Sequence, residues 1–600
     1  MSEGRSRLPT NLLLAVLAAG PFIFGCVEPW SRSILELAWL GLAIASVLRP
    51  SAGTGVPPVA IAALLIAGLG WLQVRDIRSA AEAVSGVSTV SGWATAREAL
   101  LWAVYACVAW TAARLASNWV TFRRLLWTVF LAGTAFAAIG ITQEGSGTPC
   151  IYGLRAIPRG LHPFGPYFYQ NHAGGLLAMS IFAGAGLVMA RWAGYEGKRT
   201  LGALSNFWAE QSLLIGCLVL QGWGVWVSSS RGAFHSLMMG TAVMGAIGVA
   251  LFARPGTRRY WITGFVLAGM AYFTLVIWFP RLADISEKGS LGSSMSARMV
   301  IWEDTAEMIR QRPWWGFGLG AFPYAFPAFQ EPGGPLGGIV EHAHGDWLEL
   351  AATGGFAGLG LFALGALFQF IRGVRAWNAC RDPGGRWLIA GALGAGLTLV
   401  IHGTMEMSFQ SPASAVIFLA LLSAVPWPAV SVTSSPASAN SKWYEVPRLR
   451  TIRRWVAVVV LVIGVWAAWG PLRGAWLASR GTGEDLGLRA NSLEAALRSD
   501  PGNPRTYREL SVTYLWLGED RTAGRLLLAS RALRTAEAGL KVTPDHSGLW
   551  EVKGIALTWL GRRPEAWVAL ERAKELAPWK AARKGAVKPA KAPLTRKGQK

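Results

Sequence analysis

The sequence predicts an all-α polytopic membrane protein with a small helical domain near its C-terminus. Of its 600 residues, 52% are hydrophobic and only 15% are charged, so the chain is too apolar to form one soluble domain. The formal net charge is +23, and most of the excess lies in short segments between apolar runs and in the C-terminal tail. A nucleic-acid-binding protein would instead carry a basic stripe on a soluble fold, so we expect no nucleic-acid partner.

Apolar runs long enough to cross a bilayer recur along the chain and predict about 12–13 transmembrane helices. The first run lacks a small-residue cleavage site, so we interpret it as a membrane span and not as a removed signal peptide. The predicted spans are residues 11–27, 34–48, 58–74, 98–116, 125–142, 172–190, 212–229, 233–253, 260–280, 351–371, 387–404, 411–427 and 455–470.

The basic residues between these spans set the predicted orientation. If Arg5 and Arg7 lie in the cytoplasm, the basic clusters of every second connection lie there too, as the positive-inside rule requires. The N-terminus is therefore predicted to be cytoplasmic, and the long segments 75–97, 143–171 and 281–350 are predicted to face the opposite side.

The chain becomes polar after the last span and contains a short repeat. Trp516-Leu517-Gly518 recurs as Trp559-Leu560-Gly561, and Pro544 and Pro578 are 34 residues apart, the tetratricopeptide period. We expect a degenerate two-repeat helical module that resembles tetratricopeptide repeats and leans on the membrane domain, because two repeats rarely suffice for independent stability. The predicted domains are a membrane domain at 1–428 with an outer loop at 281–350, a cytoplasmic linker at 429–454, an additional span at 455–470, the repeat module at 484–579 and a basic disordered tail at 580–600.

Arg231 lies at the end of an apolar run, directly after Ser228, Ser229 and Ser230. An arginine deep in a bilayer costs ~2.5–3.5 kcal/mol on insertion scales, so this position calls for a headgroup contact or a ligand. Snorkelling to lipid headgroups is one explanation. The three serines favour an anion site, because they supply hydroxyl donors and can interrupt the helix around the anion.

Arg298 precedes an amphipathic stretch, residues 299–311, and an aromatic-glycine turn at 312–318. Tryptophan favours the headgroup zone, so this stretch is predicted to lie on the outer membrane surface. The position alone fits a ligand-binding arginine and a solvated loop arginine equally well.

His344 lies just before a span, in the sequence Glu341-His342-Ala343-His344-Gly345-Asp346. We expect Asp346 to cap the following helix, whose N-terminal dipole would favour the neutral imidazole, the resting state of a general base. Metal binding through His342, His344 and the nearby carboxylates, or a purely structural loop, are the alternatives. No DxD or HExxH motif accompanies the histidines and the five cysteines form no CxxC pair, so we expect no metal and no cofactor.

Two weaker clusters are predicted on the same side. Asn171 and His172 follow an aromatic-glycine segment and could line a sugar cleft. His402 and Glu406 are four residues apart and are predicted to share one helix face within the membrane. Buried ionisable groups in a span are candidates for function, although a polar pair that holds two helices together is equally compatible.

The order of these motifs resembles the O-antigen ligase and O-antigen polymerase superfamily. The similarity covers roughly residues 95–430. The motifs are Gly-Pro-Tyr-x-x-x-Asn-His at 165–172, Ser-Ser-Arg-Gly at 229–232, Ser-x-Arg-x-x-x-Trp with Pro-x-x-Gly-x-Gly at 296–318, Ala-His-x-Asp-x-Leu at 343–348, and the segment from His402 to Pro412.

The resemblance implies a polytopic glycosyltransferase of the GT-C type in the bacterial inner membrane, with its active site and C-terminal repeats in the periplasm. By matching position, Arg231 and Arg298 would bind the diphosphate of an undecaprenyl-diphosphate-linked glycan, and His344 would be the essential histidine. The sequence departs from the family pattern at Gly345, where relatives usually have Asn, and at Glu406, where Asp is more usual. It also has a second histidine nearby, which leaves open which imidazole is catalytic. Further residues expected to line the substrate site are Asn171, His172, Ser229, Ser230, His342, Asp346, His402 and Glu406.

The residue types fit this chemistry independently of the resemblance. A transferase that faces outward has no nucleotide sugar, so its donor must carry stored energy in a lipid diphosphate bond. Two guanidinium groups can bind that diphosphate, and a neutral imidazole can deprotonate the acceptor hydroxyl, so no metal is obligatory. The acceptor could be a glycolipid such as lipid A-core, another lipid-linked glycan, or a protein hydroxyl.

Two other classes of function fit the sequence less well. A small-solute transporter, for example for bicarbonate, would predict inverted repeats, and the sequence shows none. A scaffold that uses the repeats to bind a partner protein leaves the two arginines and the histidine without a role.

Overall fold

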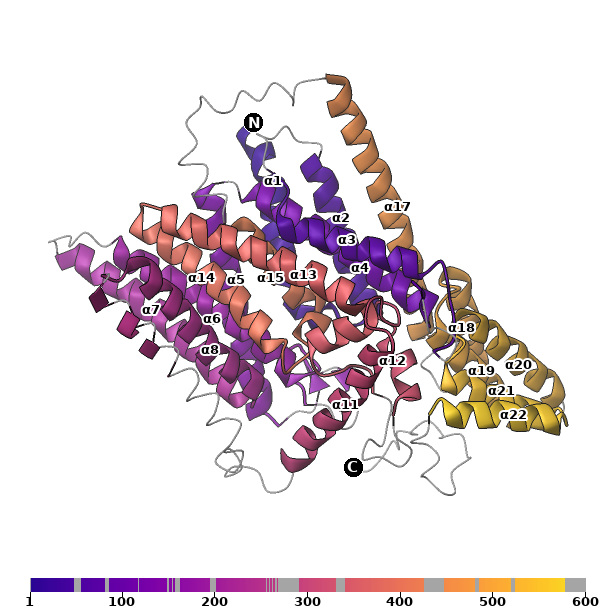
Figure 1. The fold of residues 1–600 in the computed structure, drawn as a ribbon. Helices are drawn as coiled ribbons and strands as arrows, with labels where there is room; N and C mark the ends of the chain where they lie inside the picture. The colour runs from indigo at the N-terminus through magenta and orange to yellow at the C-terminus, as the bar shows by residue number, and fades with distance from the viewer. Residues whose placement is uncertain are drawn as a thin grey trace, which may run out of the picture.

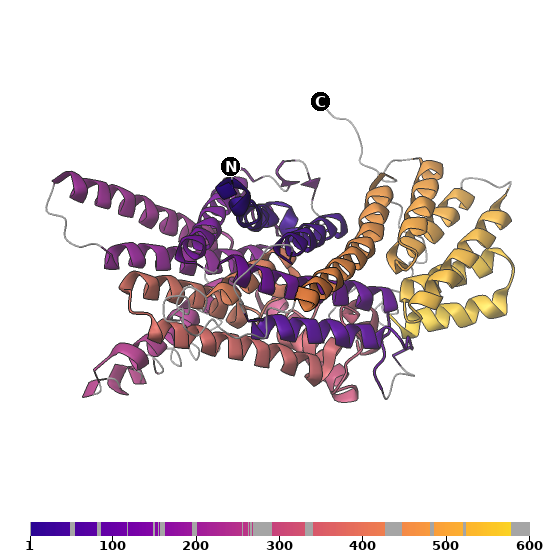
Figure 2. The same ribbon diagram turned by 90° about the horizontal axis from the view of Figure 1, so that it is seen from above.

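The computed structural model of the chain is almost entirely helical. It describes residues 2–47, 55–80, 86–116, 118–147, 150–153, 155–156, 162–194, 201–254, 256–257, 259–261, 263–264, 267, 291–330, 340–425, 447–480, 485–519 and 524–577. In two perpendicular views, long helices form a bundle, and α17 leads from it to a group of shorter helices beyond one end (Figures 1 and 2). The predicted all-α class is confirmed.

The helices of the bundle follow the predicted order. The first half contains α1 (Ser2–Ala19), η1 (Gly20–Phe22), η2 (Phe24–Cys26), α2 (Pro29–Val47), α3 (Pro58–Gln73), α4 (Gly92–Leu115), α5 (Trp119–Gly145) and the antiparallel strands β1 (Cys150–Ile151) and β2 (Arg155–Ala156). The second half contains α6 (Gln170–Ala193), α7 (Leu201–Val227), α8 (Arg231–Phe252), α11 (Leu291–Gln311), α12 (Phe322–Ala325), η4 (Phe326–Ala328), α13 (Asp346–Ala379), α14 (Pro383–His402), η5 (Ser408–Gln410), α15 (Pro412–Ala424) and α17 (Pro447–Arg480).

Five helices in the described part of the chain are long and apolar enough to cross a membrane: α5, α6, α8, α13 and α14. Three shorter apolar helices accompany them, at Leu8–Phe22, Pro58–Gln73 and Pro412–Ala424. The other predicted spans also coincide in the main with helices, except 260–280, which lies largely outside the described residues. Most of the predicted linker, 429–446, and the tail, 580–600, lie outside them too, and α17 begins within the predicted linker at Pro447.

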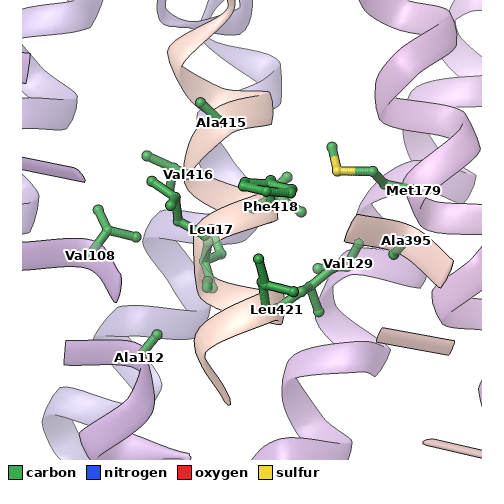
Figure 3. Close-up of a cluster of buried hydrophobic side chains, with 14 of the residues drawn as sticks. Leu17, Val108, Ala112, Val129, Met179, Ala395, Ala415, Val416, Phe418 and Leu421 are labelled. Atoms are coloured by element: carbon green, nitrogen blue, oxygen red, sulfur yellow. The ribbon is translucent and has the colours of Figure 1, made fainter. Parts of the chain in front are cut away.

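The core of the bundle is centred on α15, in which every residue is buried. A helix that is apolar on all sides is stable only when other helices surround it. Figure 3 shows Phe418 and Leu421 of this helix among side chains from several neighbouring helices, including Val108, Val129 and Met179.

Small residues allow the closest helix pairs to approach. At the crossing of α6 and α14, a Cβ atom on Gly186 would lie only 2.9 Å from the Cα of Gly391. Glycine at such crossings lets helix backbones pack directly against each other, as is common in membrane proteins.

Segments that were predicted to share one side of the membrane meet at one end of the bundle. The backbone N–H of Val90 donates to the carbonyl of Phe317 at 3.1 Å, which joins segment 75–97 to segment 281–350. Asn171 and Arg298 both bond to Glu406, so the end of segment 143–171 lies there as well.

A break in α13 is built into this same end. Gly355 has φ 67° and ψ −176°, a conformation that is essentially restricted to glycine. The break exposes the carbonyls of residues 352 and 353, and the N–H groups of Phe317 and Gly318 donate to them at 3.0 and 2.9 Å. The amide of Gln73, at the end of α3, donates to the Trp315 and Thr353 carbonyls at 2.7 and 3.1 Å. Three distant segments are thereby joined by buried hydrogen bonds.

The C-terminal module consists, within the described residues, of five amphipathic helices that pack in sequence as antiparallel hairpins. They are α18 (Leu486–Ser499), α19 (Pro504–Glu519), α20 (Arg525–Val542), α21 (Ser547–Trp559) and α22 (Arg563–Glu575). The two copies of the Trp-Leu-Gly motif touch, because Gly518 lies against the ring of Trp559. The tetratricopeptide assignment itself stays a prediction.

We expect Gly355→Ala to destabilise the protein strongly, because a Cβ atom there would lie 2.2 Å from the backbone carbonyl of Trp314. The positive φ alone is worth roughly 1–3 kcal/mol. The matched control is Gly360→Ala in the same helix, where a Cβ atom would meet nothing within 4 Å. Melting temperatures of the purified protein in detergent measure the difference, and equal values for the two variants would contradict this role of the break.

Candidate functional site

The N-terminal ends of three helices meet at the turn that follows α14, residues 402–406. Asn171, on the first turn of α6, donates to Glu406 at 2.8 Å. Gly232, on the first turn of α8, packs against the same carboxylate side chain. The backbone N–H of Asp346, the first residue of α13, donates to the carbonyl of Gly403 at 2.8 Å. Helix N-termini carry partial positive charge, so this end of the bundle is suited to an anion.

Glu406 joins α6 and α11 through its buried side chain. It is 3% exposed and accepts hydrogen bonds from Arg298 Nη2 at 2.7 Å and from Asn171 Nδ2 at 2.8 Å. Burial raises the pKa of Glu406 above its ordinary value, although Arg298 and Asn171 favour the charged form.

The prediction that His402 and Glu406 share a helix face within the membrane is wrong. α14 ends at His402, and Glu406 lies in the turn beyond it, where its backbone N–H donates to the His402 carbonyl at 3.1 Å. The two side chains are nevertheless neighbours, because both face Gly232: a Cβ atom there would lie 2.9 Å from Glu406 Cγ and 3.1 Å from His402 Nε2.

Arg231 is the first residue of α8, and its side chain is exposed. The serines before it interrupt the helix as predicted: Ser229 has φ 53°, and the Ser230 hydroxyl caps α8 by accepting from Ala233 N–H at 3.4 Å. Because the next residue, Gly232, packs on Glu406, the Arg231 backbone lies beside the carboxylate that Arg298 binds.

Arg298 reaches the site from α11, and its side chain is 21% exposed. Besides Glu406, its guanidinium contacts the carbonyl of Met405 at 3.4 Å. One turn further along α11, Trp302 Nε1 donates to the carbonyl of Ala343 at 3.0 Å. The helix that carries the arginine thus also holds the segment that carries the two histidines.

The histidine segment is fixed by Glu349 of α13. One carboxylate oxygen of Glu349 lies 3.0 Å from His342 Nδ1 and also accepts from Gln410 Nε2 at 3.0 Å. The other oxygen accepts from the backbone N–H of Ala343 at 2.9 Å. Glu349 was not among the residues predicted from the sequence, although its place three residues after Asp346, on the same face of a helix, is a signal for it.

His344 adopts a left-handed backbone conformation with φ 51°, which is uncommon for a residue other than glycine and often marks a functional site. Burial lowers the pKa of its imidazole to about 4, and the positive charges of Arg298 and His342 act in the same direction. His344 is therefore neutral at neutral pH.

Asp346 does not cap α13, so that part of the prediction is wrong. Gly345 occupies the N-cap position without a side-chain bond, and Asp346 is the first residue of the helix. Its carboxylate instead accepts from the backbone N–H of Phe409, with oxygen distances of 3.1 and 3.2 Å. A partner far along the chain has replaced the local one.

Several buried polar atoms of this cluster have no hydrogen-bond partner among the described residues. They are His172 Nε2, His344 Nδ1, His402 Nε2 and Glu406 Oε2. The imidazole of His172 interacts electrostatically with those of His342, His344 and His402. Buried polar groups are normally satisfied, so this concentration of unpaired atoms indicates a place where polar groups from outside the described chain bind.

A family model described as O-Antigen ligase matches residues 216–363 of the chain. The matched range contains Arg231, Arg298, His342 and His344, whereas Glu406 lies beyond it. No curated protein matches the sequence significantly.

A double-mutant cycle on the folding free energy should show strong coupling between Arg298 and Glu406. Removal of either partner leaves a charge that the other had neutralised, so we expect a coupling of about 1–3 kcal/mol. The control cycle is Arg310 with Glu307, an exposed pair on the same helix, with an expected coupling below about 0.5 kcal/mol. A coupling at the Arg298 pair no larger than in the control would show that the buried contact does not hold the site together.

Proposed function

We propose that this chain, whose residues 216–363 match a family model described as O-Antigen ligase, is a membrane glycosyltransferase that moves a glycan from undecaprenyl diphosphate to an acceptor hydroxyl. The observation that carries the proposal is the contact of Arg298 with Glu406, on which the residue next to Arg231 also packs. Two arginines from distant parts of the chain thereby border one buried carboxylate, beside a neutral histidine. This combination suits a diphosphate donor and a proton acceptor.

In the proposed reaction, Arg231 and Arg298 bind the donor diphosphate together with the N-terminal end of α8. Glu406 and the Met405 carbonyl engage only part of the five N–H donors of Arg298 and orient its guanidinium for the rest. As the diphosphate leaves, both arginines stabilise the negative charge that develops on it.

His344 acts as the general base in this mechanism. It takes the proton of the acceptor hydroxyl while the hydroxyl oxygen attacks the anomeric carbon of the glycan. The bond between that carbon and the diphosphate oxygen breaks, its electron pair leaves with undecaprenyl diphosphate, and the anomeric centre inverts. The two arginines supply the charge stabilisation that a metal ion provides in other transferases, so the mechanism requires no metal.

The remaining side chains of the cluster would line the substrate site. The unpaired nitrogens of His172 and His402 are suited to sugar hydroxyls, and Asn171, Asp346 and the serines before Arg231 hold the surrounding backbone and side chains in place. We further propose that this end of the bundle lies in the periplasm and the N-terminus in the cytoplasm of an inner-membrane protein, as the distribution of basic residues favours.

Three variants of this function differ in the acceptor of the glycan. A ligase transfers the glycan to a glycolipid such as lipid A-core, a polymerase to another lipid-linked glycan, and an oligosaccharyltransferase to a protein hydroxyl. A deletion strain distinguishes them, since it would accumulate full-length lipid-linked glycan, single lipid-linked units or unglycosylated protein, respectively.

Replacement of the three central residues should abolish transfer without unfolding the protein. We expect His344→Ala to lower transfer about 10²–10⁴-fold, the usual contribution of a general base, and Arg231→Ala and Arg298→Ala to lower it as strongly. The measurement is transfer of a lipid-linked glycan in membranes of the deletion strain complemented with each variant. The controls are His162→Ala, an exposed histidine, and Arg310→Ala on the helix of Arg298. Full activity of both His344→Ala and Arg231→Ala would refute the mechanism.

The pH dependence of kcat/KM distinguishes the two histidines. A general base must be unprotonated, and with the pKa of His344 at about 4 we expect the rate to fall only as the pH drops through about 4. For His342, burial favours the neutral form, but the carboxylate of Glu349 outweighs it and raises the pKa above its ordinary value. A rate that already falls between pH 7 and 6 (about the ordinary range of a histidine) would therefore assign the base to His342. If His344 is the base, His342→Ala should leave the shape of the pH profile of kcat/KM unchanged.

A further inference from the structure

The C-terminal module is fixed to the membrane domain by buried and partly buried polar contacts. Trp93 Nε1 donates to Asp500 Oδ1 at 2.8 Å, and the hydroxyls of Ser91 and Thr543 lie 3.0 Å apart. Asp545, which is 2% exposed, accepts from the backbone N–H of Ala80 and pairs with Arg572 of the module at 3.2 Å. Buried polar groups that satisfy one another across two bodies indicate a permanent contact, because separation would leave them unpaired unless water replaced every partner.

The module also reaches the segment that carries the two histidines. Arg505, in the first turn of α19, pairs with Glu341 at 3.2 Å and interacts electrostatically with Tyr324 of α12. Tyr324 in turn packs against His546 of the module, with ring centroids 5.7 Å apart. Arg505 thus bridges α12 and the residue that immediately precedes His342.

We propose that Arg505 is a positioning residue of the active site, which makes the C-terminal module part of the catalytic unit. The inference rests on the proposed transferase function for its effect on catalysis, but its structural part stands alone. Arg505 holds Glu341, and Glu341 holds the upstream end of the short segment whose downstream end is His344.

Residues of α11 and α13 hold the part of the segment that lies between Glu341 and His344. Glu349 binds His342 and the backbone of Ala343, and Trp302 binds the Ala343 carbonyl. His344 itself has a left-handed backbone and an unpaired Nδ1, so nothing among the described residues fixes its ring by a hydrogen bond from that atom. The orientation of His344 therefore depends on the placement of the residues before it, and the Arg505–Glu341 pair is the anchor of the first of them.

Because the ion pair is exposed, an effect of Arg505 on the position of His344 can be distinguished from an effect on protein stability. The side chains of Arg505 and Glu341 are 59% and 55% exposed, and exposed ion pairs contribute little to folding. A displacement of about 1 Å at a catalytic group can nevertheless lower a rate about 10²-fold. Loss of Arg505 should accordingly change catalysis far more than stability.

The test uses the full-length protein in membranes and in detergent. We expect Arg505→Ala to lower kcat for glycan transfer about tenfold or more, with the KM for the lipid-linked donor and the melting temperature unchanged. Arg505→Lys should retain most of the activity. Glu341→Arg combined with Arg505→Glu should recover a large part of what each single change loses. The matched control is Arg498→Ala, which removes an exposed arginine paired with Glu494 on the same module.

Hydrogen exchange provides a second measurement that does not depend on enzyme activity. Backbone amides of a peptide spanning residues 340–348 should exchange faster in Arg505→Ala than in the unmodified protein, and should be unchanged in Arg498→Ala. Unchanged exchange, or a kcat equal to that of the unmodified protein, would overturn the positioning role, as would failure of the charge reversal to restore activity. Faster exchange in a protein that shows no glycan transfer at all would instead refute the proposed function and leave the positioning role intact.

Discussion

A buried carboxylate at the end of a helix bundle organises the candidate site of this protein. Glu406 lies in the turn after α14, where it meets the N-terminal ends of α6, α8 and α13 and the guanidinium of Arg298. The partial positive charges of three helix ends and the charge of an arginine would repel one another in an apolar surrounding, and the carboxylate of Glu406 offsets part of that repulsion.

The all-α architecture could be predicted from the sequence because helices leave local signals. The roles of the candidate site residues stay predictions, although the structure brings several of these residues together. Apolar runs gave the helices of the bundle, and the alternation of basic residues gave the three segments that meet at one end. Ser229 and Ser230 interrupt the helical backbone before Arg231 as expected, since serine readily forms local hydrogen bonds and helix caps.

Errors arose where a distant partner replaced a local one. Helical periodicity placed Glu406 on the face of His402, but α14 ends at His402 and Glu406 binds side chains from α6 and α11. Capping rules assigned Asp346 to its own helix, but its carboxylate binds the backbone of Phe409, 63 residues away. No local pattern indicated the contact of Arg505, because its partner Glu341 lies 164 residues away along the chain.

The spacing of the site residues along the chain also determines when the site can form during synthesis. Arg298 emerges from the ribosome more than a hundred residues before Glu406, and the bond between them spans 108 positions. Arg505 follows about another hundred residues later, after α15, α17 and α18. A nascent chain that ends before Glu406 therefore holds Arg298 without its counter-charge and the histidine segment without its contact to Arg505. The candidate site is therefore complete only when synthesis of the chain is nearly finished.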